Sequence, residues 1–171
     1  VDNCETEWGY MDHLTETNEQ NKKEGYSSVV VESNIDLATK VVNVGKTDLL
    51  YNPYRSNNEL GIAFWAYFED ASKITSARIV LLNDIAGVNG VKWNVTENLT
   101  DGWNYIVLGV EAAEFFGTFD VDAINYVQYG VFATEKVTAL IDRVRVINYA
   151  IEANRAEPAY EGLDRYEVSR I

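Results

Sequence analysis

The stretch Glu59–Asp70, ELGIAFWAYFED, places the strongest constraint on the fold. Its apolar residues alternate with a period of two, as in a β-strand. One side of that strand would carry Leu60, Ile62, Phe64, Ala66 and Phe68. The other side would present Trp65 and Tyr67, where a strand facing water normally has charged or hydroxyl side chains. The pattern therefore predicts one face in a core and a second face that is either covered by another layer or binds something flat and partly apolar.

The composition is that of one globular domain rich in β-structure. The chain has 171 residues, with eleven Tyr and four Trp against two Pro and one Met. Aromatic and β-branched residues favour sheet over helix. No apolar run is long enough to span a bilayer, and no signal peptide is visible. The first residue is Val1 rather than Met, so we expect an excised domain or a mature form.

Charge and cysteine content exclude several classes of function. The net charge is −13, from 27 acidic and 14 basic residues, which argues against binding to a nucleic-acid backbone. It is compatible with neutral ligands, or with acidic groups held by a cation. Cys4 is the single cysteine, so there is no internal disulfide and no thiolate metal site.

The spacing of strand and turn signals predicts an all-β fold. Asp101-Gly102 and the Gly87–Gly90 segment are typical of tight turns between antiparallel strands. Strands of this length every eight to twelve residues indicate a two-sheet antiparallel β-sandwich. Besides the strand described above, we expect strands at Val1–Glu5, Ser28–Glu32, Lys40–Val44, Ser76–Asn83, Val91–Thr96, Trp103–Gly109, Ala123–Ala133 and Val137–Tyr149.

Two segments lack a strand pattern. We expect Glu111–Asp122 to be an acidic loop with one helical turn near Ala112–Phe116. Residues 150–171 gain charge and lose periodicity, so we assign residues 1–149 to the sandwich and 150–171 to a C-terminal tail or a linker.

Several short motifs, in their order along the chain, resemble a known family. They are the opening DNCE, then KEGYS from Lys23, AFWAY from Ala63, KWN from Lys92, DGWN from Asp101, and LIDRVRV from Leu140. Together they resemble the jelly-roll carbohydrate-binding modules of the galactose-binding-like type, which are appended to bacterial glycan-degrading enzymes. The resemblance covers about Val1–Asn148. It implies a jelly-roll sandwich that binds a polysaccharide without cleaving it, beside a catalytic domain in a secreted or cell-surface bacterial protein.

The same resemblance implies a structural calcium ion. The matching positions are Glu5, the backbone oxygens of Lys23 and Gly25, and Asp142, with Asp2 as a substitute. Strand parity places Asp142 on the same face as Leu140, Val144 and Val146, so its carboxylate should point toward the core. A carboxylate there needs a cation or several donors. The alternatives are an ion pair with Lys22, Lys23 or Arg143, or a position in water at the rim. Cys4, where a larger apolar residue is usual in the family, leaves the ligand assignment open.

Two surfaces are candidates for ligand binding. Aromatic platforms with planar donors suit sugars, which combine apolar C–H patches with hydroxyl groups. The first surface is the open face of a sheet. If side chains are assigned to faces by their alternation along each strand, this face carries Trp65, Tyr67, Arg78, Lys92, Asn94, Tyr126 and Gln128. The second surface is a loop end with Tyr51, Tyr54, Arg55 and Asn57, together with Trp8 and Tyr10.

Each of these readings has a purely structural alternative. Trp65 and Tyr67 could be core residues, and the loop tyrosines could simply hold a long loop in place. We assign Trp93 and Trp103 to the core and omit them from the site.

The sequence gives little support to catalysis. The spacing Glu-x-Asp-x-x-Glu of laminarinase-like glycosidases does not occur. Glu111, Glu114, Asp120 and Asp122 form an acidic cluster that we interpret as solvated surface. His13 is the only histidine, so a nucleophile activated by histidine is disfavoured. The alternatives that stay open are an adhesin or assembly domain that binds another protein, and an enzyme, either a polysaccharide lyase that uses Tyr and Arg or a glycoside hydrolase.

Overall fold

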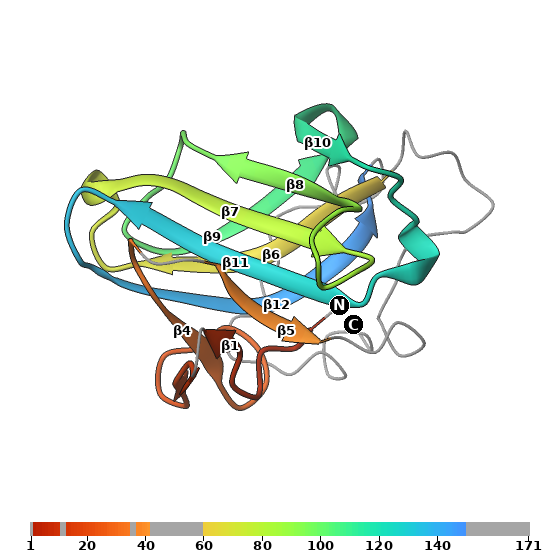
Figure 1. Cartoon of the computed structure of the whole chain (residues 1–171). Helices are drawn as coiled ribbons and strands as arrows, with labels where there is room; N and C mark the ends of the chain where they lie inside the picture. Colours follow the sequence, from red (N-terminus) through yellow and green to blue (C-terminus); the bar gives the residue numbers. More distant parts are fainter. Residues whose placement is uncertain (1, 11–12, 35–36, 42–59, 150–171) are drawn as a thin grey trace, which may run out of the picture.

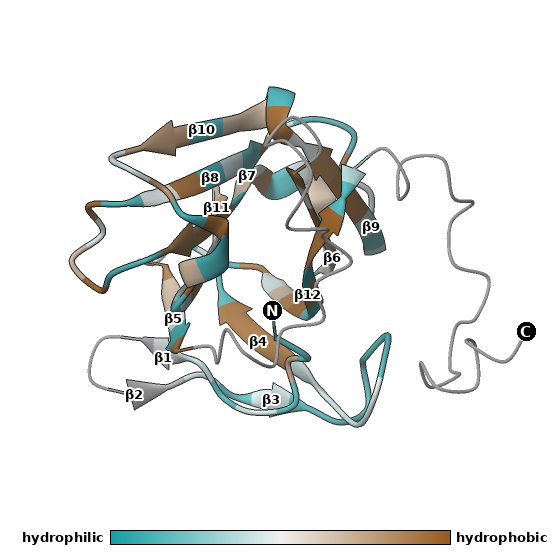
Figure 2. Cartoon of the chain, turned by 90° about the vertical axis from the view of Figure 1, so that its right-hand side faces the viewer, coloured by the Kyte–Doolittle hydropathy of each residue, from teal (hydrophilic) through white to brown (hydrophobic). Residues whose placement is uncertain are grey.

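The computed structural model describes residues 2–10, 13–34, 37–41 and 60–149, which form two antiparallel β-sheets packed face to face (Figure 1). Figure 2 views the two layers end-on, with β10, β8, β7, β11 and β5 in one layer and β9, β6, β12 and β4 in the other. The predicted antiparallel sandwich is confirmed.

The first layer is a five-stranded sheet in the order β3-β4-β12-β6-β9. The strands are β3 (Thr17–Asn18), β4 (Ser28–Glu32), β12 (Thr138–Asn148), β6 (Leu60–Phe68) and β9 (Gly102–Gly109). β6 is an inner strand and pairs with β12 on one side and with the edge strand β9 on the other.

The second layer is a seven-stranded sheet in the order β10-β8-β7-β11-β5-β1-β2. The strands are β10 (Ala113–Phe116), β8 (Gly90–Val95), β7 (Ile74–Leu82), β11 (Tyr126–Ala133), β5 (Ala38–Val41), β1 (Gly9–Tyr10) and β2 (His13–Leu14). Among the described residues, the short 3₁₀ turns η3 (Ala71–Lys73), η4 (Val110–Ala112) and η5 (Val121–Ala123) connect strands.

The core lies between the two sheets, and β6 faces it as its pattern predicts. Phe64 is fully buried and its ring packs edge-on against Tyr129 of β11, with 5.8 Å between the ring centroids. Trp93 of β8 is also fully buried, as predicted, and its Nε1 donates to the carbonyl of Gly109 at 3.0 Å. These contacts join the two layers across the core.

A bulge in β12 changes which side chains face the core. The register against β6 shifts between Asp142 and Arg145, and Arg143 has a φ of 49° in the left-handed region. Val144 therefore belongs to the core cluster, whereas Asp142 lies opposite Trp65 on the outer side of the sheet. The prediction that Asp142 shares a face with Val144 was wrong, because it assumed an uninterrupted strand.

Two other expectations fail locally. The segment Ala113–Phe116 is the edge strand β10, paired with β8, rather than a helical turn. The opening segment forms an isolated bridge between Asp2 and Val144 in place of a strand over Val1–Glu5.

Candidate functional site

The side chains predicted to share one sheet face lie on opposite sides of the molecule. Trp65 and Tyr67 belong to β6 in the five-stranded sheet. The remaining members, Arg78, Lys92, Asn94, Tyr126 and Gln128, belong to β7, β8 and β11 of the seven-stranded sheet. The predicted single surface is therefore wrong. Period two tells which residues share a side of one strand, but it does not tell which sheet the strand joins.

The outer side of the five-stranded sheet leaves Trp65 little room for a ligand. The side chain is 3% exposed. Lys23 Nζ lies 4.3 Å from the centre of its ring, and the ring of Tyr105 lies 4.8 Å away. Arg145, which is 7% exposed, donates to the Tyr105 hydroxyl. The indole of Trp65 is thus packed beneath a cation and a second ring.

Trp103 lies on this same outer side, so the prediction that it belongs to the core was wrong. Its ring is half-buried, 5.5 Å from that of Tyr67. Its Nε1 donates to Asn21 Oδ1 at 2.9 Å, which ties the N-terminal segment to β9. Alternation alone could not distinguish this residue from a core tryptophan.

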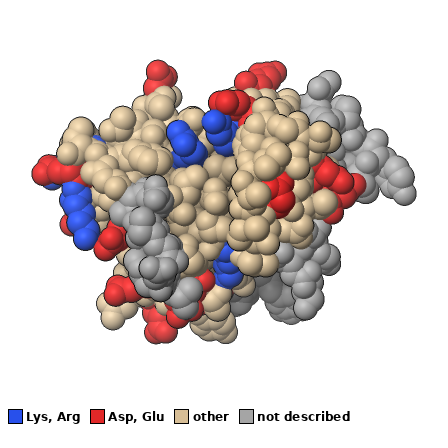
Figure 3. Space-filling view, in the orientation of Figure 1, with Lys and Arg blue, Asp and Glu red and all other residues tan. Residues whose placement is uncertain are grey.

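The outer side of the seven-stranded sheet is more open, and we call it the Arg78 face. Its side chains form rows across the strands, because residues opposite one another in the register share a side. The rows contain Phe116, Gly90, Leu82, Tyr126 and Val41, then Glu114, Lys92, Val80, Gln128 and Thr39, then Asn94, Arg78 and Gly130, and last Phe132. Figure 3 shows this side of the molecule as a largely uncharged area, with basic side chains next to one another near its upper edge.

Arg78 is held in place at one end of this face. Its Nε donates to Asn94 Oδ1 at 2.8 Å across the β7–β8 pair. Its guanidinium carbon lies 5.4 Å from the centre of the Phe132 ring on β11. Both contacts fix the plane of the guanidinium group, which is half-buried, beside the exposed Asn94.

The middle rows combine an apolar floor with polar side chains. Val80 is 4% exposed and forms part of the floor. On one side of it, Lys92 forms an ion pair with Glu114 at 3.2 Å. On the other side, Gln128 Nε2 donates to Thr39 Oγ1 at 3.0 Å, which leaves the Gln128 carbonyl oxygen as an acceptor.

The predicted loop surface falls largely outside the described residues. This applies to Tyr51, Tyr54, Arg55 and Asn57. Trp8 is fully buried, and its Nε1 donates to Asp2 Oδ1 at 3.2 Å, so its role in the described structure is packing. Tyr10 lies on β1 of the seven-stranded sheet.

The residues proposed for calcium gather around the segment 23–27. Asp142 Oδ2 accepts from the backbone N–H groups of Lys23 and Glu24 at 2.8 and 2.9 Å. Glu5 accepts from the N–H of Tyr26 at 2.9 Å, and its carboxylate lies directly against Gly25. Two carboxylates therefore hold successive parts of one turn.

Asp142 has an unusual environment. Its side chain is fully buried, and Oδ1 has no hydrogen-bond partner. Burial, together with the nearby charges of Glu24 and Glu5, raises the pKa of this carboxyl to about 7, although the two backbone N–H donors act to lower it. An unpaired carboxylate oxygen that is influenced by the charges of Glu24 and Glu5 fits a calcium ligand.

Asp2 serves a different contact from Asp142 and Glu5. Its Oδ2 forms an ion pair with Lys40 at 3.2 Å, while Oδ1 accepts from Cys4 N and Trp8 Nε1. Within the described ranges, no three His, Cys, Asp or Glu side chains are grouped closely enough to hold a metal by themselves. A calcium ion would therefore need backbone carbonyls as well as Glu5 and Asp142.

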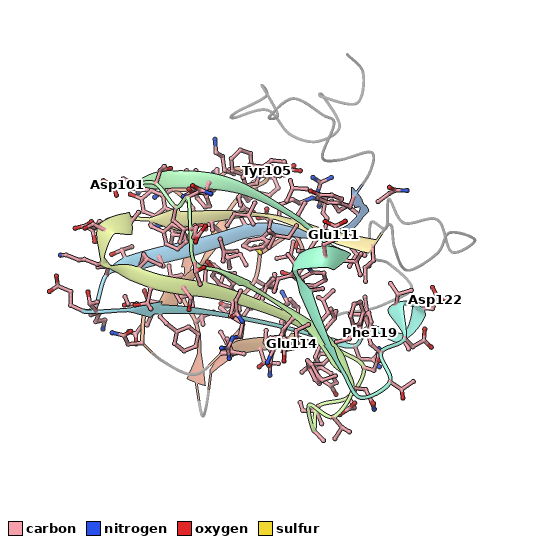
Figure 4. The ribbon with its side chains drawn as sticks, turned by 90° about the horizontal axis from the view of Figure 1, so that it is seen from above. Asp101, Tyr105, Glu111, Glu114, Phe119 and Asp122 are labelled. Atoms are coloured by element: carbon pink, nitrogen blue, oxygen red, sulfur yellow. The ribbon has the colours of Figure 1, made fainter. Side chains whose placement is uncertain are left out.

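The acidic cluster of the sequence does not form one site. Figure 4 shows Glu111, Glu114 and Asp122 projecting at separate places from η4, β10 and η5. Glu114 pairs with Lys92, and Asp120 accepts from the N–H of Asp122. The part of the chain that the structure describes contains no helix long and apolar enough to cross a bilayer.

Comparisons with known proteins support the architecture. No protein-family model matches the sequence, and no curated protein does. A family 11 carbohydrate-binding module from Clostridium thermocellum, solved with a β-1,3-1,4-mixed-linked tetrasaccharide, is 14% identical, with a TM-score of 0.52 over 86% of this chain and 94% of that one. The family 11 module of the cellulosomal cellulase Lic26A-Cel5E of the same organism is 13% identical, with a TM-score of 0.50 over 94% and 96%. The likeness confirms the jelly-roll sandwich fold.

Proposed function

We propose that this chain is a non-catalytic carbohydrate-binding module whose ligand lies along the Arg78 face. The observation that carries the proposal is the composition of that face. It combines the half-exposed Tyr126 ring with the planar polar groups of Arg78, Asn94 and Gln128 on a rigid sheet. A sugar chain offers C–H patches to a ring and hydroxyl groups to such donors and acceptors. The fold it shares with a carbohydrate-binding module solved with a tetrasaccharide supports the same assignment.

The proposal extends to the biological setting. One of the two similar structures comes from a cellulosomal cellulase, which supports a place outside the cell, in a bacterial protein that also carries a catalytic domain. The role would be to raise the local concentration of that catalytic domain on a polysaccharide. Dissociation constants on the order of micromolar to millimolar would serve this role.

A polysaccharide screen with variants on the two faces tests the proposal. Affinity gels containing neutral and acidic polysaccharides should retain the wild-type protein. Tyr126→Ala and Gln128→Ala should each lose about fivefold in affinity, because an aromatic platform or a polar contact is worth on the order of 1 kcal/mol. Tyr67→Ala is the matched control, since Tyr67 lies on the other sheet.

Two results would overturn the proposal. The first is that no polysaccharide retards the folded wild-type protein, a result that favours the adhesin or assembly alternative. The second is release of unsaturated or reducing sugars from the gel, which would reveal a lyase or hydrolase.

We also propose that a structural calcium ion binds near segment 23–27. The unpaired Asp142 Oδ1 and the adjacent Glu5 carboxylate support the site, with the backbone carbonyls of Lys23 and Gly25 as further ligands. Calcium would neutralise the buried Asp142 carboxylate and the partly exposed Glu5 carboxylate, and it would stabilise the turn. The melting temperature should rise in millimolar calcium and fall in EDTA for the wild type. Equal melting temperatures in calcium and in EDTA would contradict the proposed calcium site.

A further inference from the structure

The Arg78 face presents an excess of hydrogen-bond donors at one position. Arg78 uses Nε for Asn94, and its terminal amino groups bond to no residue that the structure describes. Asn94 turns its carbonyl oxygen toward Arg78, so its amide group keeps two donors for another partner. The ligand that meets this position must therefore offer acceptors.

Arg78 also lacks an acidic partner in the described ranges, although the chain has 27 acidic and 14 basic residues. The five ion pairs found there belong to lysines, and Lys92 beside it is matched with Glu114. A half-buried guanidinium without a carboxylate partner keeps donors that can bind a carboxylate of a ligand.

The geometry around Arg78 suits a planar anion. The Phe132 ring, 5.4 Å away, and the bond to Asn94 hold the guanidinium before any ligand arrives. A guanidinium fork held in this way binds a carboxylate through two parallel N–H···O bonds, and less conformational entropy is lost on binding. The net charge of −13 does not prevent this, because at physiological salt the screening length is about 8 Å and local charges dominate.

We propose that the glycan bound on the Arg78 face carries carboxylates, as in a polysaccharide containing uronic acid. This inference rests on the proposed carbohydrate-binding function. Arg78 binds the uronate carboxylate, and the Asn94 amide donates to the same carboxylate or to a neighbouring hydroxyl group. Tyr126 and Gln128, further along β11, contact the adjoining sugar residues.

Matched ligands test the carboxylate directly. Polygalacturonate, alginate and glucuronoxylan are compared with the same polymers after chemical reduction of their carboxyl groups, by titration calorimetry of the chain in 0.15 M salt. At least one native polymer should bind about tenfold or more tightly than its reduced form, the range of a charge-assisted bidentate contact. Arg78→Gln should remove this preference, and Arg78→Lys should restore part of it.

The control and the contrary results separate this inference from the proposed function. Lys136→Gln removes one positive charge from an exposed position by the five-stranded sheet, and it should leave the affinity unchanged. Equal binding of native and reduced polymers, or binding of neutral glycans alone, would overturn the carboxylate inference while the proposed function stands. If the chain binds none of the polymers, native or reduced, both the inference and the proposed function are overturned. Melting curves confirm that each variant is folded.

Discussion

At the scale of single residues, Asp142 connects the fold to its pH dependence. Its pKa is raised from 3.8 to about 7 in the folded protein, so the native state holds a proton that the unfolded chain releases. Stability from this group is therefore fully present below about pH 4, and it is lost as pH rises toward 7. A shift of this size lowers the unfolding free energy by on the order of 4 kcal/mol above pH 7, relative to its value below pH 4.

This leads to a prediction for Asp142→Asn. In EDTA, the wild type should lose more unfolding free energy than the variant between pH 4 and pH 8, because the variant has no carboxyl to ionise. Urea titrations at several pH values measure the difference between the two curves. Millimolar calcium should reduce the wild-type loss, since the ion stabilises the ionised carboxylate. Parallel curves for the two proteins in EDTA would contradict the assignment.

Gly25 carries a second prediction at this scale. Its φ is +69°, and an added Cβ would lie 1.8 Å from Glu5 Oε1. Gly25→Ala should therefore lower the unfolding free energy by more than the roughly 1 kcal/mol expected from backbone strain alone, because the Glu5 carboxylate must also move. Gly87→Ala is a matched control, with a φ of +72° and open space around the new Cβ. Equal losses in urea unfolding for the two variants would show that contact with Glu5 is unimportant.

At the scale of elements, the strands that follow a simple pattern could be predicted. The prediction of Ser28–Glu32 matches β4, and the alternation of Glu59–Asp70 identifies β6, because both strands put one clear side into the core. β12 was predicted, but its bulge was not, since a left-handed Arg143 leaves no mark on the hydrophobic pattern. β10 was missed because its exposed Glu114 and Phe115 show no buried face.

The close packing of β8 and β10 gives a prediction at this scale. A Cβ on Gly90 would lie 2.6 Å from the Leu81 carbonyl oxygen and 2.6 Å from Phe116 Cζ. Gly90→Ala should therefore destabilise the protein by about 1–3 kcal/mol and loosen the edge strand. Hydrogen exchange should show faster exchange for the amides of Ala113–Phe116, while β12 keeps its protection. Unchanged exchange in β10 would mean that Phe116 moves aside without cost.

At the scale of the whole molecule, alternation predicted which side chains leave the core side of each strand, but it could not show which of them share a surface. Alternation put Trp65 on the non-core side of its strand, and it put Arg78 and Gln128 on the corresponding side of theirs. Only the order of strands in each sheet shows that these sides face away from each other. That order is set by contacts between residues far apart in the chain, which local periodicity does not record.

Because Trp65 and Tyr126 lie on opposite faces, we expect substitutions of Trp65 to change stability but not glycan affinity, and substitution of Tyr126 to change affinity but hardly stability. Trp65→Ala should cost about 3–5 kcal/mol of unfolding free energy, since it removes a buried indole that packs against Lys23 and Tyr105. Trp65→Phe should cost less, because a smaller ring still fills part of the space. Below their melting temperatures, both variants should bind the glycan with a dissociation constant within about twofold of the wild-type value, because Trp65 does not contact the proposed ligand.

Tyr126→Ala should show the reverse pattern. Its half-exposed ring is removed from the Arg78 face, so affinity falls while the unfolding free energy changes by about 1 kcal/mol or less. Urea unfolding and titration calorimetry on the same samples give both quantities. A folded Trp65→Phe protein that has lost its affinity for the glycan would show that the ligand binds on the five-stranded sheet. Trp65 lies on the outer side of that sheet, so it could contact only a ligand bound there.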